Sequence, residues 1–147
     1  TQAPPAGQNL VVYNLTATGI GGNAYRGDNR AVVGADSTVA KINLNPDMKF
    51  PRSSPYQRFF LLNGPVSYVC NPSAGTLMRH DSYVISTDQS TNPGGTAAIM
   101  TRHVSACSFT YAAGTTQRAG LVTMRLEVEV EGETITLFHQ VHVDNAP

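Results

Sequence analysis

The two cysteines, Cys70 and Cys107, are the residues of this chain best suited to chemistry. Such a pair can provide a nucleophile, metal ligands, a redox couple or a disulfide. The two residues lie far apart in the sequence and form no Cys-x-x-Cys motif, which argues against a thioredoxin-like redox site. No further cysteine and no suitably spaced histidine stands near either one to complete a zinc site.

Both cysteines lie in apolar, strand-like contexts, Ser-Tyr-Val-Cys and Ser-Ala-Cys-Ser-Phe. We therefore predict a disulfide between Cys70 and Cys107. Closing that loop would stabilise the fold by about 4 kcal/mol on the chain-entropy model, and it would place the protein outside the reducing cytosol. The alternative is a pair of buried thiols in a cytosolic protein.

The histidines do not form a ligand set. His139 and His142 are three positions apart on a predicted strand, so their side chains point to opposite faces. We expect His139 to be a core histidine with satisfied hydrogen bonds rather than a ligand. His80 and His103 each stand beside a charged residue without a third partner at a recognisable spacing. We expect neither a metal nor a cofactor.

The sequence contains none of the common catalytic motifs, such as a Gly-x-Ser-x-Gly elbow, a His-Glu-x-x-His pair, a Walker loop or a dinucleotide fingerprint. The glycine-rich stretch 19–30 lacks the lysine and the following helix that phosphate binding needs, and it is expected to be a loop. The aspartates are isolated and offer no paired carboxylates. We therefore expect a protein that is not an enzyme. An exported hydrolase is the alternative, and it would require a pocket with paired titratable groups.

The length and the charge of the chain further limit the class of protein to which it can belong. The chain has 147 residues, ten basic and ten acidic side chains, and a net charge of zero. This length suits a single domain covering residues 1–147. The basic residues are scattered, so nucleic acid is not expected as a partner. No apolar run is long enough to span a membrane, and the polar, proline-containing start does not resemble a signal peptide.

Hydrophobic periodicity predicts a mainly β fold of antiparallel sheets with long loops and at most one or two short helices. Strands are expected at 8–15, 37–44, 57–62, 66–70 and 76–80. Glycine- and proline-rich segments predict loops at 19–30, 45–56 and 86–95. The segment 95–104 is the one stretch expected to form a short helix.

The C-terminal segment 121–143 predicts a β-hairpin. Apolar residues occupy even positions up to Val130 and odd positions from Ile135 onward. A two-residue turn at Glu131-Gly132 explains this switch, because it places Val128 opposite Ile135 and brings both apolar sets to one face.

The other face of this hairpin would carry an acidic row formed by Glu127 and Glu129, with the turn residue Glu131 as a candidate third member. We expect this row to be a solvated sheet face. The alternative is a docking surface for a basic partner.

Several motifs, taken in order, resemble the minor pilins of MSHA-type type IV pili. They are distributed over most of the chain: VVYNL (11–15), AYRGDNRAVV (24–33), RFFLLNGPVSYVC (58–70), GTLMRHDSY (75–83), VSACSFTY (104–111) and the C-terminal segment 120–147. The sequence is similar, more distantly, to the J pseudopilin of type II secretion.

This resemblance implies an N-terminal hydrophobic helix, cleaved by a prepilin peptidase, followed by a β-rich head that assembles with other minor pilins at pilus initiation or at the tip. It also implies that the protein is located at the periplasmic face of the inner membrane and in the pilus of a Gram-negative bacterium. The processing motif and the helix are absent from this sequence. We therefore expect the chain to be the C-terminal part of a longer protein, anchored in the inner membrane through that helix.

A second reading is an adhesive or ligand-binding module at the pilus tip. The loops 19–30 and 45–56 would then hold the ligand. Tyr25, Arg26, Tyr56 and Arg58 could stack on it and donate hydrogen bonds, although aromatic residues in loops more often pack locally.

Overall fold

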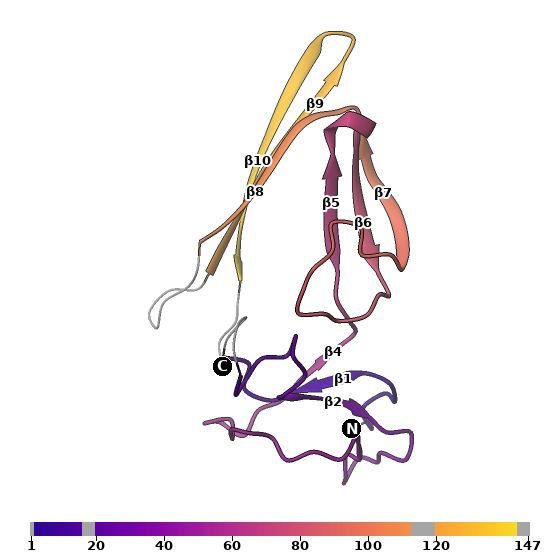
Figure 1. Cartoon of the computed structure of the whole chain (residues 1–147), viewed down its shortest axis with the longest axis vertical. Helices are drawn as coiled ribbons and strands as arrows, with labels where there is room; N and C mark the ends of the chain where they lie inside the picture. The colour runs from indigo at the N-terminus through magenta and orange to yellow at the C-terminus, as the bar shows by residue number, and fades with distance from the viewer. Residues whose placement is uncertain (1, 16–19, 113–119, 144–147) are drawn as a thin grey trace. The chain divides into compact units, whose positions relative to one another are not determined.

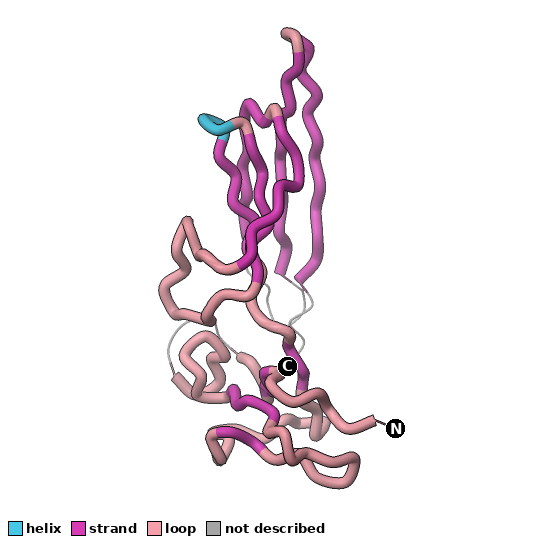
Figure 2. Tube along the Cα trace, turned by 90° about the vertical axis from the view of Figure 1, so that its right-hand side faces the viewer, coloured by secondary structure: helices cyan, strands magenta, loops and turns pink. Residues whose placement is uncertain are grey.

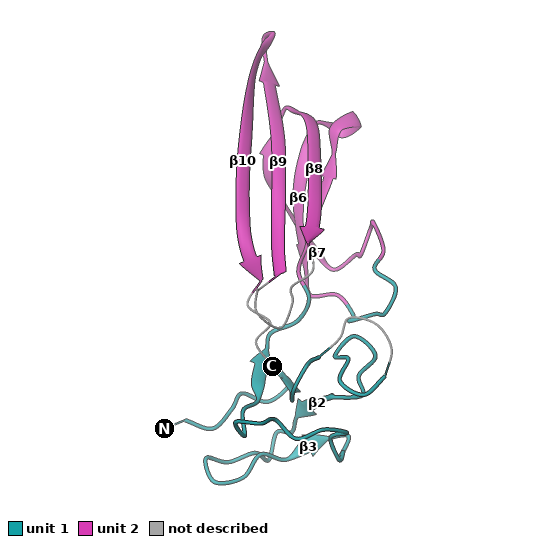
Figure 3. Ribbon diagram, turned by 90° about the vertical axis from the view of Figure 1, so that its left-hand side faces the viewer, with its two compact units in different colours: residues 1–65, 84–89, 147 teal, residues 66–83, 90–146 magenta. Residues whose placement is uncertain are grey.

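The computed structural model describes residues 2–15, 20–112 and 120–143 and has the mainly β fold that the sequence predicts. The chain divides into two compact units (Figure 3). Unit 1 comprises residues 1–65 and 84–89 with residue 147, and unit 2 comprises residues 66–83 and 90–146. Figure 2 shows unit 1 as mostly loop and unit 2 as mostly strand. That residues 1–147 form a single domain stays a prediction.

Unit 1 is built on a four-stranded antiparallel sheet in the order β3-β2-β1-β4. Its strands are short: β1 (Asn9–Val11), β2 (Arg30–Val33), β3 (Leu44–Asn45) and β4 (Phe60–Leu62). The buried core consists of Leu10, Val11, Ala31 and Val33. Because so little apolar area is buried here, hydrogen bonds within the loops carry much of the local order.

Unit 2 contains two three-stranded antiparallel sheets, labelled in Figure 1. The first, in the order β5-β6-β7, is formed by β5 (Ser67–Asn71), β6 (Thr76–Asp81) and β7 (Thr96–Arg102). The second, in the order β10-β9-β8, is formed by β8 (Val104–Ala112), β9 (Gly120–Val130) and β10 (Glu133–Val143). A 3₁₀ turn, η1 (Pro72–Ala74), connects β5 to β6. The buried core of this unit is Leu77, Val104 and Leu126.

The C-terminal hairpin has the register that the sequence predicts. Val128 pairs with Ile135, and the pairing runs without a bulge from Val130–Glu133 to Gly120–Val143. Both turn residues, Glu131 and Gly132, have positive φ angles, 52° and 83°. This conformation is that of a two-residue type I′ turn, whose twist matches the twist of the strands. The shift of the apolar residues from even to odd positions therefore results from the two-residue length of the turn.

Three of the predicted elements differ in the structure. The expected helix at 95–104 is wrong, because Thr96–Arg102 pairs with β6 as strand β7. The strand expected at 37–44 is largely a turn, in which Ser37 and Asn43 exchange hydrogen bonds between side chain and backbone. Such local bonds compete with a β-ladder. The strand expected at 8–15 is limited to β1, since Tyr13 has a φ of 49°.

The structure also contains strands that periodicity did not predict. β2 lies at the end of the glycine-rich stretch, and its four residues are too few to show a clear alternation. In the part of the chain that the structure describes, no helix has the length and apolar character needed to cross a membrane.

Candidate functional site

The predicted disulfide is present. Cys70 in β5 and Cys107 in β8 are bonded through their sulfur atoms, with their Cα atoms 6.6 Å apart. The bond joins the two sheets of unit 2, and it packs with Val128 against the buried residues Leu77, Val104 and Leu126. Neither cysteine is a free thiol. Of the roles that two cysteines can have, this pair therefore has that of a structural disulfide.

One face of the β8–β9–β10 sheet is almost entirely apolar, and we call it the apolar face. Its side chains lie in rows across the three strands, as the register dictates: Cys107–Leu126–Leu137, Phe109–Met124–His139 and Tyr111–Val122–Val141, with Val128–Ile135 at the turn end. Only the part near the disulfide is buried, where Leu126 is 4% exposed. The rows away from the disulfide have no comparable cover among the described residues.

Exposure of the apolar face is large on both outer strands. Phe109 and Tyr111 of β8 are 43% and 59% exposed, and Ile135, Leu137 and Val141 of β10 are 63%, 50% and 50% exposed. In Figure 1 the two sheets of unit 2 come together near η1 and diverge toward the other ends of their strands. Periodicity could identify this face from the sequence, but it could not show that the face stays uncovered.

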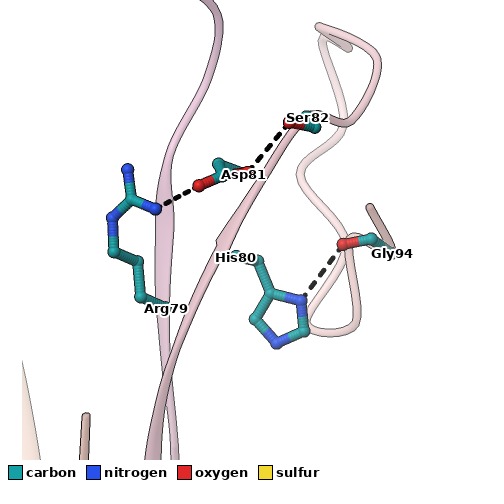
Figure 4. Close-up of polar contacts among 5 residues, drawn as sticks. All are labelled: Arg79, His80, Asp81, Ser82 and Gly94. Atoms are coloured by element: carbon teal, nitrogen blue, oxygen red, sulfur yellow. Dashed lines mark hydrogen bonds and ion pairs between the residues drawn. The ribbon is translucent and has the colours of Figure 1, made fainter. Parts of the chain in front are cut away.

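The expectation for His139 is wrong, because its side chain is exposed on the apolar face. The buried histidine is instead His80 in β6, which is 8% exposed. Its Nδ1 atom lies 3.1 Å from the carbonyl oxygen of Gly94 (Figure 4). A position on an apolar row predicts burial only where a second layer covers that row, and the sequence does not reveal where that layer ends.

The neighbours of His80 form a polar cluster on the opposite face of β6. Arg79 donates to Asp81 as an ion pair, and the hydroxyl of Ser82 donates to Asp81 Oδ1 at 2.9 Å. The hydrogen bonds from Arg79 and Ser82 hold the pKa of Asp81 below its ordinary value. Figure 4 shows the His80 ring directed toward Gly94 and the Asp81 carboxylate directed toward Arg79 and Ser82. The cluster thus ties the end of β6 to the loop that follows it.

Residues 20–29 of the glycine-rich stretch form a loop, as predicted, while residue 19 lies outside the described residues; a carboxylate organises this loop. Asp28 accepts hydrogen bonds from the backbone N–H groups of Gly21, Gly22 and Asn23, at 2.7, 3.2 and 2.7 Å. Burial raises the pKa of Asp28, but these three bonds outweigh it and hold the pKa below its ordinary value. Gly22 has a φ of 132°, and a Cβ there would lie 3.2 Å from the carbonyl oxygen of Tyr13.

The residues proposed for a ligand lie on two loops of unit 1. Tyr25 and Tyr56 are 48% and 74% exposed, and the guanidinium of Arg58 lies over the Tyr56 ring at 4.9 Å from its centroid. The residue that joins the two loops is Arg52, which sequence reasoning did not select. Its Nε donates to the carbonyl oxygen of Gly21 at 3.0 Å.

Unit 1 also contains a pocket of about 260 Å³, which no local sequence pattern predicts. It lies between β1, β2 and the segment Asn45–Met48, with Arg30 as its charged lining residue. Arg30 donates to the side chain of Asn9 at 3.3 Å. The pocket is assembled from separate segments, and only the tertiary fold brings them together.

The acidic row on the polar face is present but partly neutralised. Glu127 forms an ion pair with Arg125 on the same face of β9, and Glu129 is exposed. Among the described residues, no three or more His, Cys, Asp and Glu side chains form a group that could hold a metal ion. No family model, no curated protein and no solved structure matches the chain.

Proposed function

We propose that this chain is the head of a minor pilin or pseudopilin of an MSHA-type type IV pilus. In this proposal it is a structural protein that assembles with other minor pilins at pilus initiation or at the tip, and it catalyses no reaction. The motifs that resemble this family support the proposal, as does the disulfide, because disulfides persist outside the reducing cytosol. The proposed location is the periplasmic face of the inner membrane and the pilus.

The observation that carries the proposal is the exposed apolar face of the β8–β9–β10 sheet. Antiparallel sheets commonly pack one face on a core and leave a polar face in water. Here the apolar face includes exposed aromatic and aliphatic side chains on both outer strands, among them Phe109 and Leu137. Contiguous exposed apolar surface of this kind is typical of protein–protein contact sites. An assembly subunit would cover the face with a neighbouring subunit or with a helix of the parent protein.

The coding sequence upstream of Thr1 provides a direct test. A minor pilin requires a processing site there, with a glycine before Phe-Thr-Leu and a glutamate five residues into the mature chain, followed by an apolar helix. An upstream sequence that encodes an unrelated domain would contradict the proposal.

Two adjacent residues of β8 allow a matched test of the apolar face. Phe109 lies on this face, while Thr110 is exposed on the opposite face of the same strand. In the source bacterium lacking the native gene, we expect the full-length protein with Phe109→Glu to restore few or no pili. The variant Thr110→Glu, which adds the same charge, should restore normal piliation. Equal piliation by both variants would exclude the apolar face as the assembly surface. Thermal unfolding of both variants separates lost docking from lost folding.

A second candidate function is an adhesive module at the pilus tip. It is favoured by the hydrogen bond between Arg52 and Gly21, which holds the loop of Tyr25 beside the loop of Tyr56. Exposed aromatic rings and a guanidinium are suited to stacking on sugar rings and to bonding their hydroxyl groups. A glycan array in which the protein binds specific glycans and Tyr56→Ala does not would support this function. An array without hits would count against it.

A further inference from the structure

β10 is an edge strand of unusual length. Among the residues that the structure describes it pairs only with β9, over eleven consecutive residue pairs without a register shift. All of its residues from Glu133 to His142 are exposed, and Phe138 is 65% exposed. A long, flat edge strand presents a row of unpaired backbone groups to any chain that can extend the sheet.

The other three edge strands of unit 2 have features that discourage such pairing. β5 has only five residues. β7 pairs with β6 across an irregularity between Leu77 and Met78, and β8 pairs with β9 across an irregularity between Val104 and Ala106. Short strands and bulges are two of the means by which proteins protect sheet edges, and lysine and proline are others. The sequence of β10, ETITLFHQVHV, contains neither lysine nor proline.

The turn determines which backbone groups of β10 face outward. In a two-residue hairpin, Val130 and Glu133 flank the turn and form a hydrogen-bonded pair. Bonded and non-bonded pairs then alternate, so the odd-numbered residues of β10 direct their N–H and C=O groups to β9. The even-numbered residues direct theirs to the open edge: Thr134, Thr136, Phe138, Gln140 and His142.

The order of side chains along β10 suits a second copy of the same strand. Phe138 is the midpoint of Glu133–Val143, so an antiparallel pair centred on Phe138 overlaps along the whole strand. The opposed residues across this pair would be Ile135 with Val141, Leu137 with His139, Thr136 with Gln140, Thr134 with His142 and Glu133 with Val143. Ile135 meets Val141 and Leu137 meets the His139 ring, while at each end Val143 meets Glu133, so the glutamates of the two copies lie at opposite ends. No opposed pair brings two carboxylates together, so like-charge repulsion does not oppose the register.

We propose that β10 is a homodimerisation edge, at which two copies of the chain pair antiparallel about a two-fold axis through Phe138. The even-numbered residues of each copy supply about ten backbone hydrogen bonds across the axis. The pair turns two three-stranded sheets into one continuous sheet, and their apolar faces lie on the same side. A two-fold contact of this type is closed, so it stops at the dimer. This dimer follows from the strand geometry of unit 2, whether or not the chain belongs to a pilus.

The test uses the full chain and places charges at the axis. In a dimer of Phe138→Lys, the two lysines at position 138 lie opposite each other. In a dimer of Phe138→Glu, two glutamates do. We expect the wild type to be a concentration-dependent dimer in sedimentation equilibrium. Each variant alone should have a dissociation constant raised by about tenfold or more, because like charges directly opposed on neighbouring strands repel. Mixing the two variants should restore dimerisation, since lysine then faces glutamate. The control Thr110→Lys adds the same charge on the same face of the sheet at its other edge, and it should dimerise like the wild type.

Amide hydrogen exchange gives a second readout that depends on the register. The amides of the even-numbered residues of β10 should become protected as the protein concentration rises, while those of the odd-numbered residues are protected at every concentration. A wild type that stays monomeric at millimolar concentration would overturn the proposal. So would a dimer that Phe138→Lys leaves unchanged, or mixed variants that fail to associate.

Discussion

Cys70 and Cys107 are bonded across the two sheets of unit 2, at the end where those sheets share their buried core. The bond adjoins Leu77 and Leu126, which lie on different sheets. The two sheets have little other common core among the described residues, because most of the apolar face is exposed. The disulfide therefore replaces much of the side-chain packing that normally holds two facing sheets together.

Removing this link should destabilise the protein strongly. The double variant Cys70→Ala/Cys107→Ala is expected to lose about 4 kcal/mol of unfolding free energy, the chain-entropy value for a loop of this size. Urea denaturation monitored by circular dichroism measures the loss. Wild-type protein treated with a reducing agent should approach the same stability. Alkylation of both thiols in the folded protein without reduction would contradict the structure.

Adjacent glycines in the loop before β7 should respond differently to the same substitution. Gly94 and Gly95 both have positive φ angles, 78° and 68°, but a Cβ at Gly94 meets nothing within 4 Å. A Cβ at Gly95 would overlap the carbonyl oxygen of Asp81. Gly94→Ala should cost about 1 kcal/mol, the cost of the backbone conformation alone.

Gly95→Ala should cost at least about 2 kcal/mol more than Gly94→Ala, because the backbone of β6 must move to admit the methyl group. The difference between the two unfolding free energies in urea tests the prediction. Equal costs would show that the loop does not approach β6 as closely as described.

The hairpin turn offers a stabilising substitution. Glu131 has a φ of 52°, a conformation that asparagine adopts more easily than glutamate. Glu131→Asn should therefore raise the unfolding free energy by about 0.5 kcal/mol. The matched control Glu133→Asn removes the same charge at a regular strand position and should produce no gain. A gain in both variants would indicate relief of acidic repulsion instead of backbone strain.

Asp28 should make unit 1 sensitive to acid. Its pKa in the folded protein lies below the ordinary value of 3.8, so the charged form stabilises the fold. This contribution is fully present above the ordinary pKa and is lost as the pH falls through the lower folded pKa. Asp28→Asn should cost about 1 kcal/mol at neutral pH, a value reduced for the exposure of the site.

The difference between wild type and Asp28→Asn should shrink as the pH falls below 3.8. Urea midpoints measured at neutral pH and in acid provide the comparison. Asp47→Asn, a substitution at an exposed position in a different loop, serves as the control and should change neither midpoint. A difference between wild type and Asp28→Asn that is constant with pH would show that the charge of Asp28 is not what organises the loop.

The contrast between the hairpin and β7 shows what the sequence could predict. The register of β9 and β10 follows from alternation and turn length, both of which are local properties. The segment around Ala97 and Ala98 has residues that favour a helix, yet its pairing with β6 makes it a strand. That pairing depends on residues distant in sequence, and periodicity within the segment does not reveal it.

The features of the candidate sites also differ in whether the sequence could predict them. The sequence predicted the disulfide, because two cysteines in strand-like contexts allow one pairing, and it predicted which residues share the apolar face. It did not predict that His139 is exposed and His80 buried, since burial depends on where a second sheet ends. The joining role of Arg52 and the pocket beside Arg30 also depend on contacts between loops that have no repeating pattern.

The position of the sulfur bridge has a mechanical consequence. When the two ends of the chain are pulled, tension crosses directly from Cys70 to Cys107 and bypasses the enclosed segment, which contains β6 and β7. The covalent path of the tension therefore does not run through these strands while the bridge is intact. Stretching of a single molecule should release only the segments outside the bridge, and reduction should add the length of the enclosed strands to the extension.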